Sequence, residues 1–153
     1  MSSSTTTTLA ELPALKGQAL GVSDWFEVAQ ERVNTFADAT DDHQWIHVDL
    51  ERAAAESPFG GPVAHGFLTL SLFVPMQGQV LAVTDAKTVV NYGLNKVRFP
   101  APVLVGSRVR LSATLADVTT VADGLQLTVA GVIEREGSDK PVCVLESLLR
   151  FYG

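Results

Sequence analysis

The feature that most constrains this chain is an apolar segment, residues 66–83, that has no polar face. Large apolar side chains point all round the helix that it would form: Phe67, Leu68, Leu70, Leu72, Phe73, Val74 and Met76. A helix that is apolar on every side must be covered on every side. The segment is too short for a bilayer, and Pro75 should kink it or end its first part. We therefore expect a helix enclosed by the rest of the chain or by a second subunit.

Four segments in the second half of the chain are long enough to enclose such a helix. They cover residues 87–99, 108–118, 124–136 and 141–152. Apolar and polar residues alternate in the second and third segments, which is typical of strands. Asp123, Gly124 and the stretch 137–141 supply turn residues between them. These patterns predict a long antiparallel meander curved round one apolar helix, in an α+β fold.

The first half of the chain predicts short helices. Residues 31–39 carry Val33, Phe36 and Ala37 at helical spacing, and Asp49 is a good N-cap for a second short helix. Residues 57–62 form a turn-rich loop. The first ten residues, rich in Ser and Thr, are expected to be a flexible tail, which leaves residues 11–153 as a single domain.

The composition excludes several classes of protein. With 46% hydrophobic and 18% charged residues the chain is not globally disordered. Eleven Lys and Arg stand against seventeen Asp and Glu, a net charge of −6 that argues against nucleic-acid binding. No run of eighteen apolar residues predicts a membrane span. The single cysteine, Cys143, and an uncharged Ser/Thr-rich start without a signal sequence favour a cytoplasmic location.

The reactive side chains gather in one part of the sequence. His43, His47 and His65 fall within 23 residues, and Asp42 precedes His47 by five positions. A carboxylate and an imidazole that share one water or one substrate proton are suited to general acid–base catalysis. Two other interpretations stay open. His43 and His47, four positions apart, can ligate a metal from one helix face, and a histidine such as His65 can be purely structural.

The stretch 40–47, Thr-Asp-Asp-His-Gln-Trp-Ile-His, is followed by Asp49 and by Ala64, His65 and Gly66. This pattern resembles the hydratase motif of the MaoC-like dehydratases, which include the (R)-specific enoyl-CoA hydratases, also called 3-hydroxyacyl-thioester dehydratases. Residues 92–103 resemble a strand of that family and its proline-containing exit. The resemblance extends from about residue 25 to residue 152. It implies the hot-dog fold, an antiparallel sheet wrapped round a long central helix and usually dimerised through the sheet.

The resemblance also implies a role for each matching residue. Asp42 matches the catalytic aspartate of the family, His47 its catalytic histidine, and Gly66 the glycine whose N–H binds the thioester carbonyl. Three further residues adjoin the motif and are expected at the pocket: Gln44, Trp45 and His65.

The chain departs from the family motif at two places. Asp41 stands where the family usually has glycine, and Gln44 with Trp45 replaces Asn-Pro. Asp41 is therefore a rival for the role of catalytic base, and only the spacing to His47 selects Asp42.

The implied activity is reversible hydration of trans-2-enoyl-CoA, or enoyl-acyl-carrier, thioesters to (R)-3-hydroxyacyl thioesters by a homodimer, without metal or organic cofactor. Two alternatives remain. A hot-dog acyl-CoA thioesterase can use Asp42 to activate water, and a non-catalytic acyl-thioester-binding subunit of a dehydratase complex needs neither Asp42 nor His47. Three cations can meet coenzyme A phosphates or simply be solvated: Lys96, Arg98 and Arg108.

Overall fold

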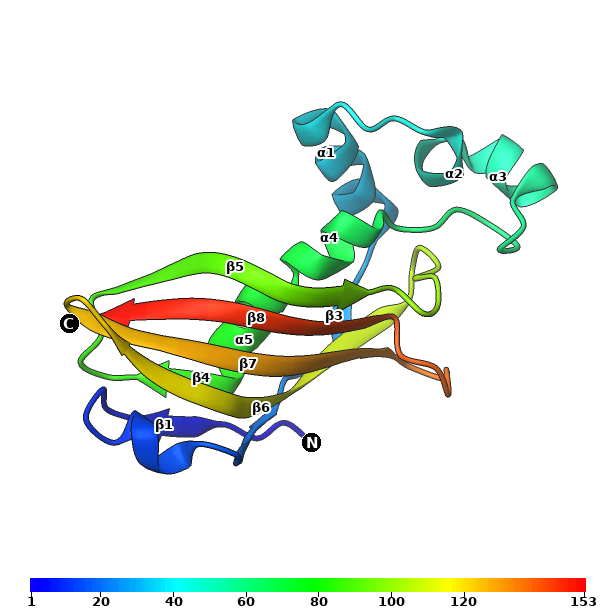
Figure 1. The fold of residues 1–153 in the computed structure, drawn as a ribbon. Helices are drawn as coiled ribbons and strands as arrows, with labels where there is room; N and C mark the ends of the chain where they lie inside the picture. Colours follow the sequence, from blue (N-terminus) through cyan, green and yellow to red (C-terminus); the bar gives the residue numbers. More distant parts are fainter.

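The computed structural model describes residues 1–153 and is built round one antiparallel sheet of six strands (Figure 1). The strands are β2 (Ala19–Val22), β3 (Phe26–Glu27), β5 (Thr88–Arg98), β6 (Arg108–Val121), β7 (Gly124–Arg135) and β8 (Cys143–Tyr152). Their order is β2-β6-β7-β8-β5, and β3 also pairs with β6. The four long strands lie in the segments that the sequence predicts, and the predicted α+β class is confirmed.

The predicted meander holds for β6, β7 and β8, but β5 is not its next member. β5 pairs with β8 along its whole length, from Thr88 opposite Tyr152 to Arg98 opposite Val144. The nine residues 99–107 cross from β5 to β6, too long a connection for a tight hairpin turn. β5 consequently forms an edge of the sheet, with only one neighbouring strand.

The apolar segment forms two consecutive helices behind the sheet, α4 (Gly66–Ser71) and α5 (Phe73–Val80) (Figure 1). The break at Leu72 is the kink that Pro75 predicts, because proline has no N–H for the carbonyl of Ser71. Met76 and Val80 are fully buried and belong to the same core cluster as Leu111 of β6. Burying each of these larger side chains favours folding by roughly 1.5–3 kcal/mol.

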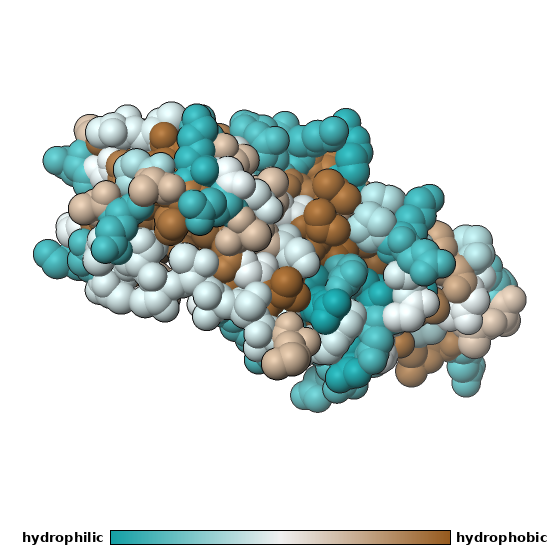
Figure 2. Space-filling model, turned by 90° about the horizontal axis from the view of Figure 1, so that it is seen from below, coloured by the Kyte–Doolittle hydropathy of each residue, from teal (hydrophilic) through white to brown (hydrophobic).

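The single chain does not cover the central helices on every side. Phe67 in α4 is 72% exposed and Val74 in α5 is 48% exposed. Residues 81–83, expected to continue the helix, instead form the short strand β4 (Leu81–Val83). Figure 2 shows apolar side chains reaching the surface between polar ones near the middle of another face.

Three more helices project beyond one end of the sheet (Figure 1). They are α1 (Gln30–Thr40), α2 (Trp45–Val48) and α3 (Leu50–Glu56). The side chain of Asp49 accepts a hydrogen bond from the N–H of Arg52 at 3.1 Å, which confirms Asp49 as the predicted N-cap of α3. α2 is a single helical turn between the two helices that the sequence predicts.

The expectation of a flexible tail over residues 1–10 is wrong. Thr5–Thr7 form strand β1, which pairs in parallel with β4, and Thr7 is buried. Threonine is β-branched and favours strands, and β4 supplies an edge for it to pair with. A short 3₁₀ helix, η1 (Leu12–Leu15), follows and buries Leu12 completely. None of the helices has the length and apolar character that crossing a bilayer requires.

Candidate active site

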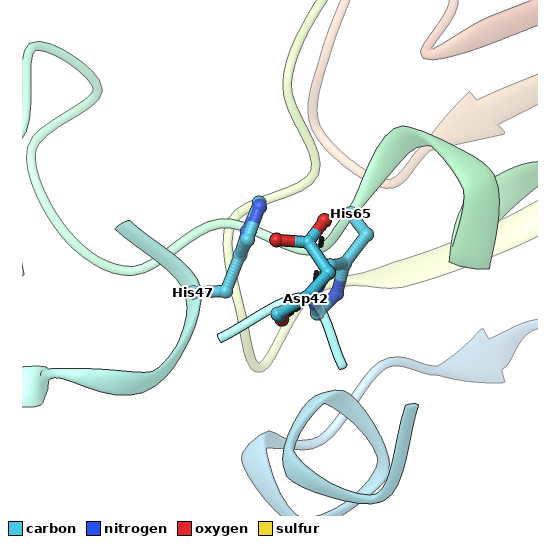
Figure 3. A group of neighbouring side chains, drawn as sticks. All are labelled: Asp42, His47 and His65. Carbon is cyan, nitrogen blue, oxygen red and sulfur yellow. Dashed lines mark hydrogen bonds and ion pairs between the residues drawn. The ribbon is translucent and has the colours of Figure 1, made fainter. Parts of the chain in front are cut away.

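Three reactive side chains meet where the helical end of the molecule joins α4. Asp42 lies in the loop after α1, His47 in α2, and His65 directly before α4 (Figure 3). A carboxylate oxygen of Asp42 and one ring nitrogen of each histidine lie within 4.8 Å of one another. Figure 3 shows the Asp42 side chain beside the imidazole rings of His47 and His65, which stack on each other. The fold thus brings the Asp42–His47 pair of the motif together and adds His65 to it.

The contacts of His47 determine which of its nitrogens is free to react. Its side chain is buried, and Nδ1 lies 2.6 Å from the backbone oxygen of Val63. A carbonyl oxygen only accepts hydrogen bonds, so Nδ1 carries the proton. In the neutral ring Nε2 therefore keeps its lone pair, which makes it an acceptor for a water or a substrate proton.

The surroundings of His47 also favour this neutral form. Burial lowers the pKa of His47 below its usual value of 6.5, and nearby His65 acts in the same direction. The hydrogen bond to Val63 and the charge of Asp42 oppose this shift but are outweighed. At neutral pH the imidazole is therefore uncharged and able to take up a proton.

Asp42 reaches this position through an unusual backbone conformation at the residue before it. Asp41 ends α1 in the left-handed region, with φ 59° and ψ 22°. Glycine adopts this conformation most easily, but aspartate also tolerates it. The substitution of the family's glycine by Asp41 therefore leaves the turn intact. The cluster includes the carboxylate of Asp42, whose side chain is 49% exposed, and not that of Asp41.

An apolar cavity of about 370 Å³ opens beside this cluster. Eight of its thirteen lining residues are hydrophobic, and His47 and Gly66 are both in its wall. A site of this kind suits an apolar ligand with one polar reacting group. Much of the wall comes from apolar residues that the sequence does not mark as pocket residues: Ile46, Phe59, Phe99, Pro100, Val103 and Val142.

Gly66 is the first residue of α4, and its N–H makes no hydrogen bond within the chain. The N–H and C=O groups of one trans peptide unit point in opposite directions. The carbonyl of His65, in the same unit, accepts a hydrogen bond from the N–H of Thr69 at 3.1 Å and so points along the helix. The N–H of Gly66 therefore points away from the helix. A Cβ here would lie 3.1 Å from the ring of Phe99, so these two cavity residues approach closely and leave little room for a side chain at position 66.

Gln44 and Trp45 do not line the cavity, contrary to expectation. Gln44 is exposed, and Trp45 packs under the guanidinium of Arg52, whose Cζ lies 4.2 Å from the ring centre. The single turn of α2 places the neighbouring Ile46 and His47 on the cavity side instead. His65 is buried next to the cavity but is not part of its wall.

The interpretation of His43 and His47 as a metal-binding pair is wrong, because His43 points elsewhere. His43 Nε2 lies 3.0 Å from Oδ1 of Asp38, an exposed residue of α1. The hydrogen bond to this carboxylate raises the pKa of His43. In the Asp42–His47–His65 cluster, His65 Nε2 lies 3.0 Å from the backbone oxygen of Asp42 and must be a donor. His65 Nε2 is therefore engaged by the loop of Asp42 and is not a free metal ligand.

Known proteins resemble this chain along most of its length. Residues 11–137 match the family described as "MaoC like domain". The chain is 56% identical over 144 residues to 3-hydroxyacyl-thioester dehydratase Z of Mycobacterium tuberculosis, covering 94% of this chain and 95% of that protein. It is 46% identical over 135 residues to nodulation protein N of Rhizobium meliloti, covering 87% of this chain and 84% of that protein.

A solved structure supports the same assignment. The (R)-hydratase from A. caviae involved in PHA biosynthesis is 25% identical, with a TM-score of 0.71, and the match covers 88% of this chain and 94% of that chain. Sheet, central helix and site thus define a hot-dog domain of the hydratase type. The chain belongs to the MaoC-like dehydratase family, as the motif in the sequence predicts.

Proposed function

We propose that this protein is a hydro-lyase that interconverts trans-2-enoyl thioesters and (R)-3-hydroxyacyl thioesters. One observation carries the proposal: His47, whose Nδ1 is held by Val63 and whose Nε2 is left as an acceptor, lies close to the Asp42 carboxylate beside an apolar cavity that also contains Gly66. The similarity to 3-hydroxyacyl-thioester dehydratase Z and to the A. caviae (R)-hydratase supports it.

In the hydration direction, Asp42 and His47 would hold one water molecule and accept a proton from it. The water oxygen would then bond to C3, and the electron pair of the double bond would move toward C2 and the thioester oxygen. The Asp42–His47 pair would return a proton to C2, so that water is added overall and no other reactant is needed.

The N–H of Gly66 would stabilise the negative charge that develops on the thioester oxygen. Its lack of a partner within the chain supports this role. One well-placed donor of this kind is worth roughly 3–4 kcal/mol of transition-state stabilisation in other enzymes. The absence of a side chain at Gly66 lets the thioester approach the backbone closely.

We also propose that the protein is a homodimer in which β5 of one protomer lies beside β5 of its partner. β5 is an edge strand with exposed apolar side chains, among them Val90, Tyr92 and Leu94. Exposed strand edges and contiguous apolar patches are typical of subunit interfaces. Phe67 and Val74 border the same groove as Leu94, so a second copy would also cover the open side of the central helices. Light scattering that shows a concentration-independent monomer would contradict this arrangement.

The test of the activity follows the absorbance of the conjugated enoyl-CoA bond across acyl chain lengths, with free thiol measured in parallel. Hydration removes the absorbance without releasing thiol and yields the (R)-3-hydroxy product on chiral analysis. Release of thiol would instead identify a thioesterase. Binding of the thioester without either change would identify a non-catalytic subunit.

A further inference from the structure

His65 contacts both catalytic groups without lining the cavity in which they would act. It is only 2% exposed, and its Nε2 lies 3.0 Å from the backbone oxygen of Asp42. Its ring stacks on that of His47, with the ring centres 3.8 Å apart and the planes inclined by 25°. The ring of Phe36 also packs on it, at 4.8 Å. Figure 3 shows how His65 approaches both partners from the start of α4.

The hydrogen bond from His65 is the main anchor of the loop that carries Asp42. Within residues 41–43 the other side-chain hydrogen bonds are local, from His43 to Asp38 and from the N–H of Gln44 to Asp42. The bond from His65 Nε2 is the one that joins these three residues to a segment beyond α2. The position of the Asp42 carboxylate relative to His47 therefore depends on His65.

The other nitrogen of His65 indicates that this residue does not serve stability alone. Because Nε2 must donate to a carbonyl oxygen, the neutral ring carries its proton there and leaves Nδ1 as an acceptor. Nδ1 is buried and has no hydrogen-bond partner. A buried acceptor without a partner lowers stability, and an apolar ring in this place would avoid that cost.

From these contacts we propose that His65 is a positioning residue. Its Nε2–H holds the Asp42 loop and its ring supports His47, so that the Asp42 carboxylate and the His47 imidazole can bind the same water molecule. This inference rests on the proposed hydratase function. In this role His65 does not contact the substrate. Its hydrogen-bond donor and its aromatic ring are two separate features, and each can be removed by substitution without the other.

Two substitutions separate these features. His65→Gln keeps an N–H donor near the position of Nε2, whereas His65→Phe keeps an aromatic ring and loses the donor. A 1 Å misplacement of a catalytic group costs about 100-fold in rate. We expect His65→Phe to lower kcat by about 10–100-fold with KM nearly unchanged, and with a melting temperature no lower than that of the unaltered protein. His65→Gln should recover most of the kcat that His65→Phe loses.

The matched control is His43→Gln, a change in an exposed histidine one residue from Asp42 that contacts Asp38 and not the cluster. It should leave kcat and KM unchanged. Nitrogen NMR of the imidazoles supplies a readout independent of activity: the proton of the neutral ring should be on Nε2 in His65 and on Nδ1 in His47. His65→Phe should shift the signals of His47.

Three results would overturn the inference: full kcat in His65→Phe, kcat and melting temperature that fall together in both variants, or a proton on Nδ1 of His65. A different result would overturn the proposed function itself, namely an unaltered protein that does not hydrate enoyl-CoA of any chain length. The two failures are therefore distinguishable in one set of measurements.

Discussion

Replacing Gly66 by alanine tests the close approach on which the cavity depends. A Cβ at this position would lie 3.1–3.3 Å from three atoms of the Phe99 ring, whereas carbon atoms in ordinary contact are about 3.5–4.0 Å apart. Either the ring or the first turn of α4 must therefore move by about 0.3–0.5 Å. A 1 Å misplacement of a catalytic group lowers the rate about 100-fold, and complete loss of an oxyanion donor lowers kcat about 100–1,000-fold. We therefore expect kcat of Gly66→Ala to fall about 10–100-fold.

The stability of the same variant should change little. Phe99 is 42% exposed and can yield, and alanine favours a helix over glycine by up to about 1 kcal/mol. The assay is kcat on one enoyl-CoA together with the melting temperature. Gly78→Ala is the matched control, since Gly78 lies in α5 and a Cβ there meets no atom within 4 Å. Unchanged kcat and KM in Gly66→Ala would refute the argument that this backbone contacts the substrate.

Three further predictions concern pH, the turn before Asp42, and metal. Because burial lowers the pKa of His47 from its usual 6.5, the midpoint of the acid-side loss of kcat/KM should lie below pH 6.5. The stability that the neutral ring contributes is present above the unfolded-state pKa and should be lost as the pH falls through the folded-state pKa. A midpoint of this decline above pH 6.5 would contradict the prediction. Asp41→Gly relieves a left-handed residue and should raise the free energy of unfolding by up to about 1 kcal/mol with kcat unchanged, as measured by denaturant titration. Exhaustive chelation should leave activity unchanged, and a loss that zinc restores would contradict the metal-free mechanism.

The sequence predicts the strands well because their signal is local. Each long strand shows its own alternation or apolar run, and turn residues separate it from the next, so their positions need no knowledge of the fold. The pairing of β5 with β8 depends on how the chain crosses over after residue 98, and no local pattern encodes that. The N-terminal strand β1 is similar, since Thr5–Thr7 find their partner β4 more than seventy residues away.

The candidate site also contains residues that local sequence predicts and residues that only the tertiary structure reveals. Asp42 and His47 are close in sequence, so their spacing alone suggests a pair. The place of His65 against both of them arises only when the segment before α4 packs against α2, and sequence spacing does not reveal it. Trp45 is misassigned because one turn of helix decides which side chains face inward, and a four-residue helix has too little periodicity to show this.

The central claim is that Asp42 and His47 act together on one water molecule. The most direct test is kcat on a single enoyl-CoA for Asp42→Asn, His47→Gln, the double variant and Asp41→Asn, with circular dichroism and light scattering to verify folding and assembly. Each substitution at Asp42 or His47 should lower kcat by at least ~100-fold. The double variant should be little worse than either single one, because groups that act as a unit are strongly non-additive. Asp41→Asn should retain most of its turnover. Near-normal kcat in Asp42→Asn with loss in Asp41→Asn would place the base one residue earlier, and near-normal kcat in both would contradict the account.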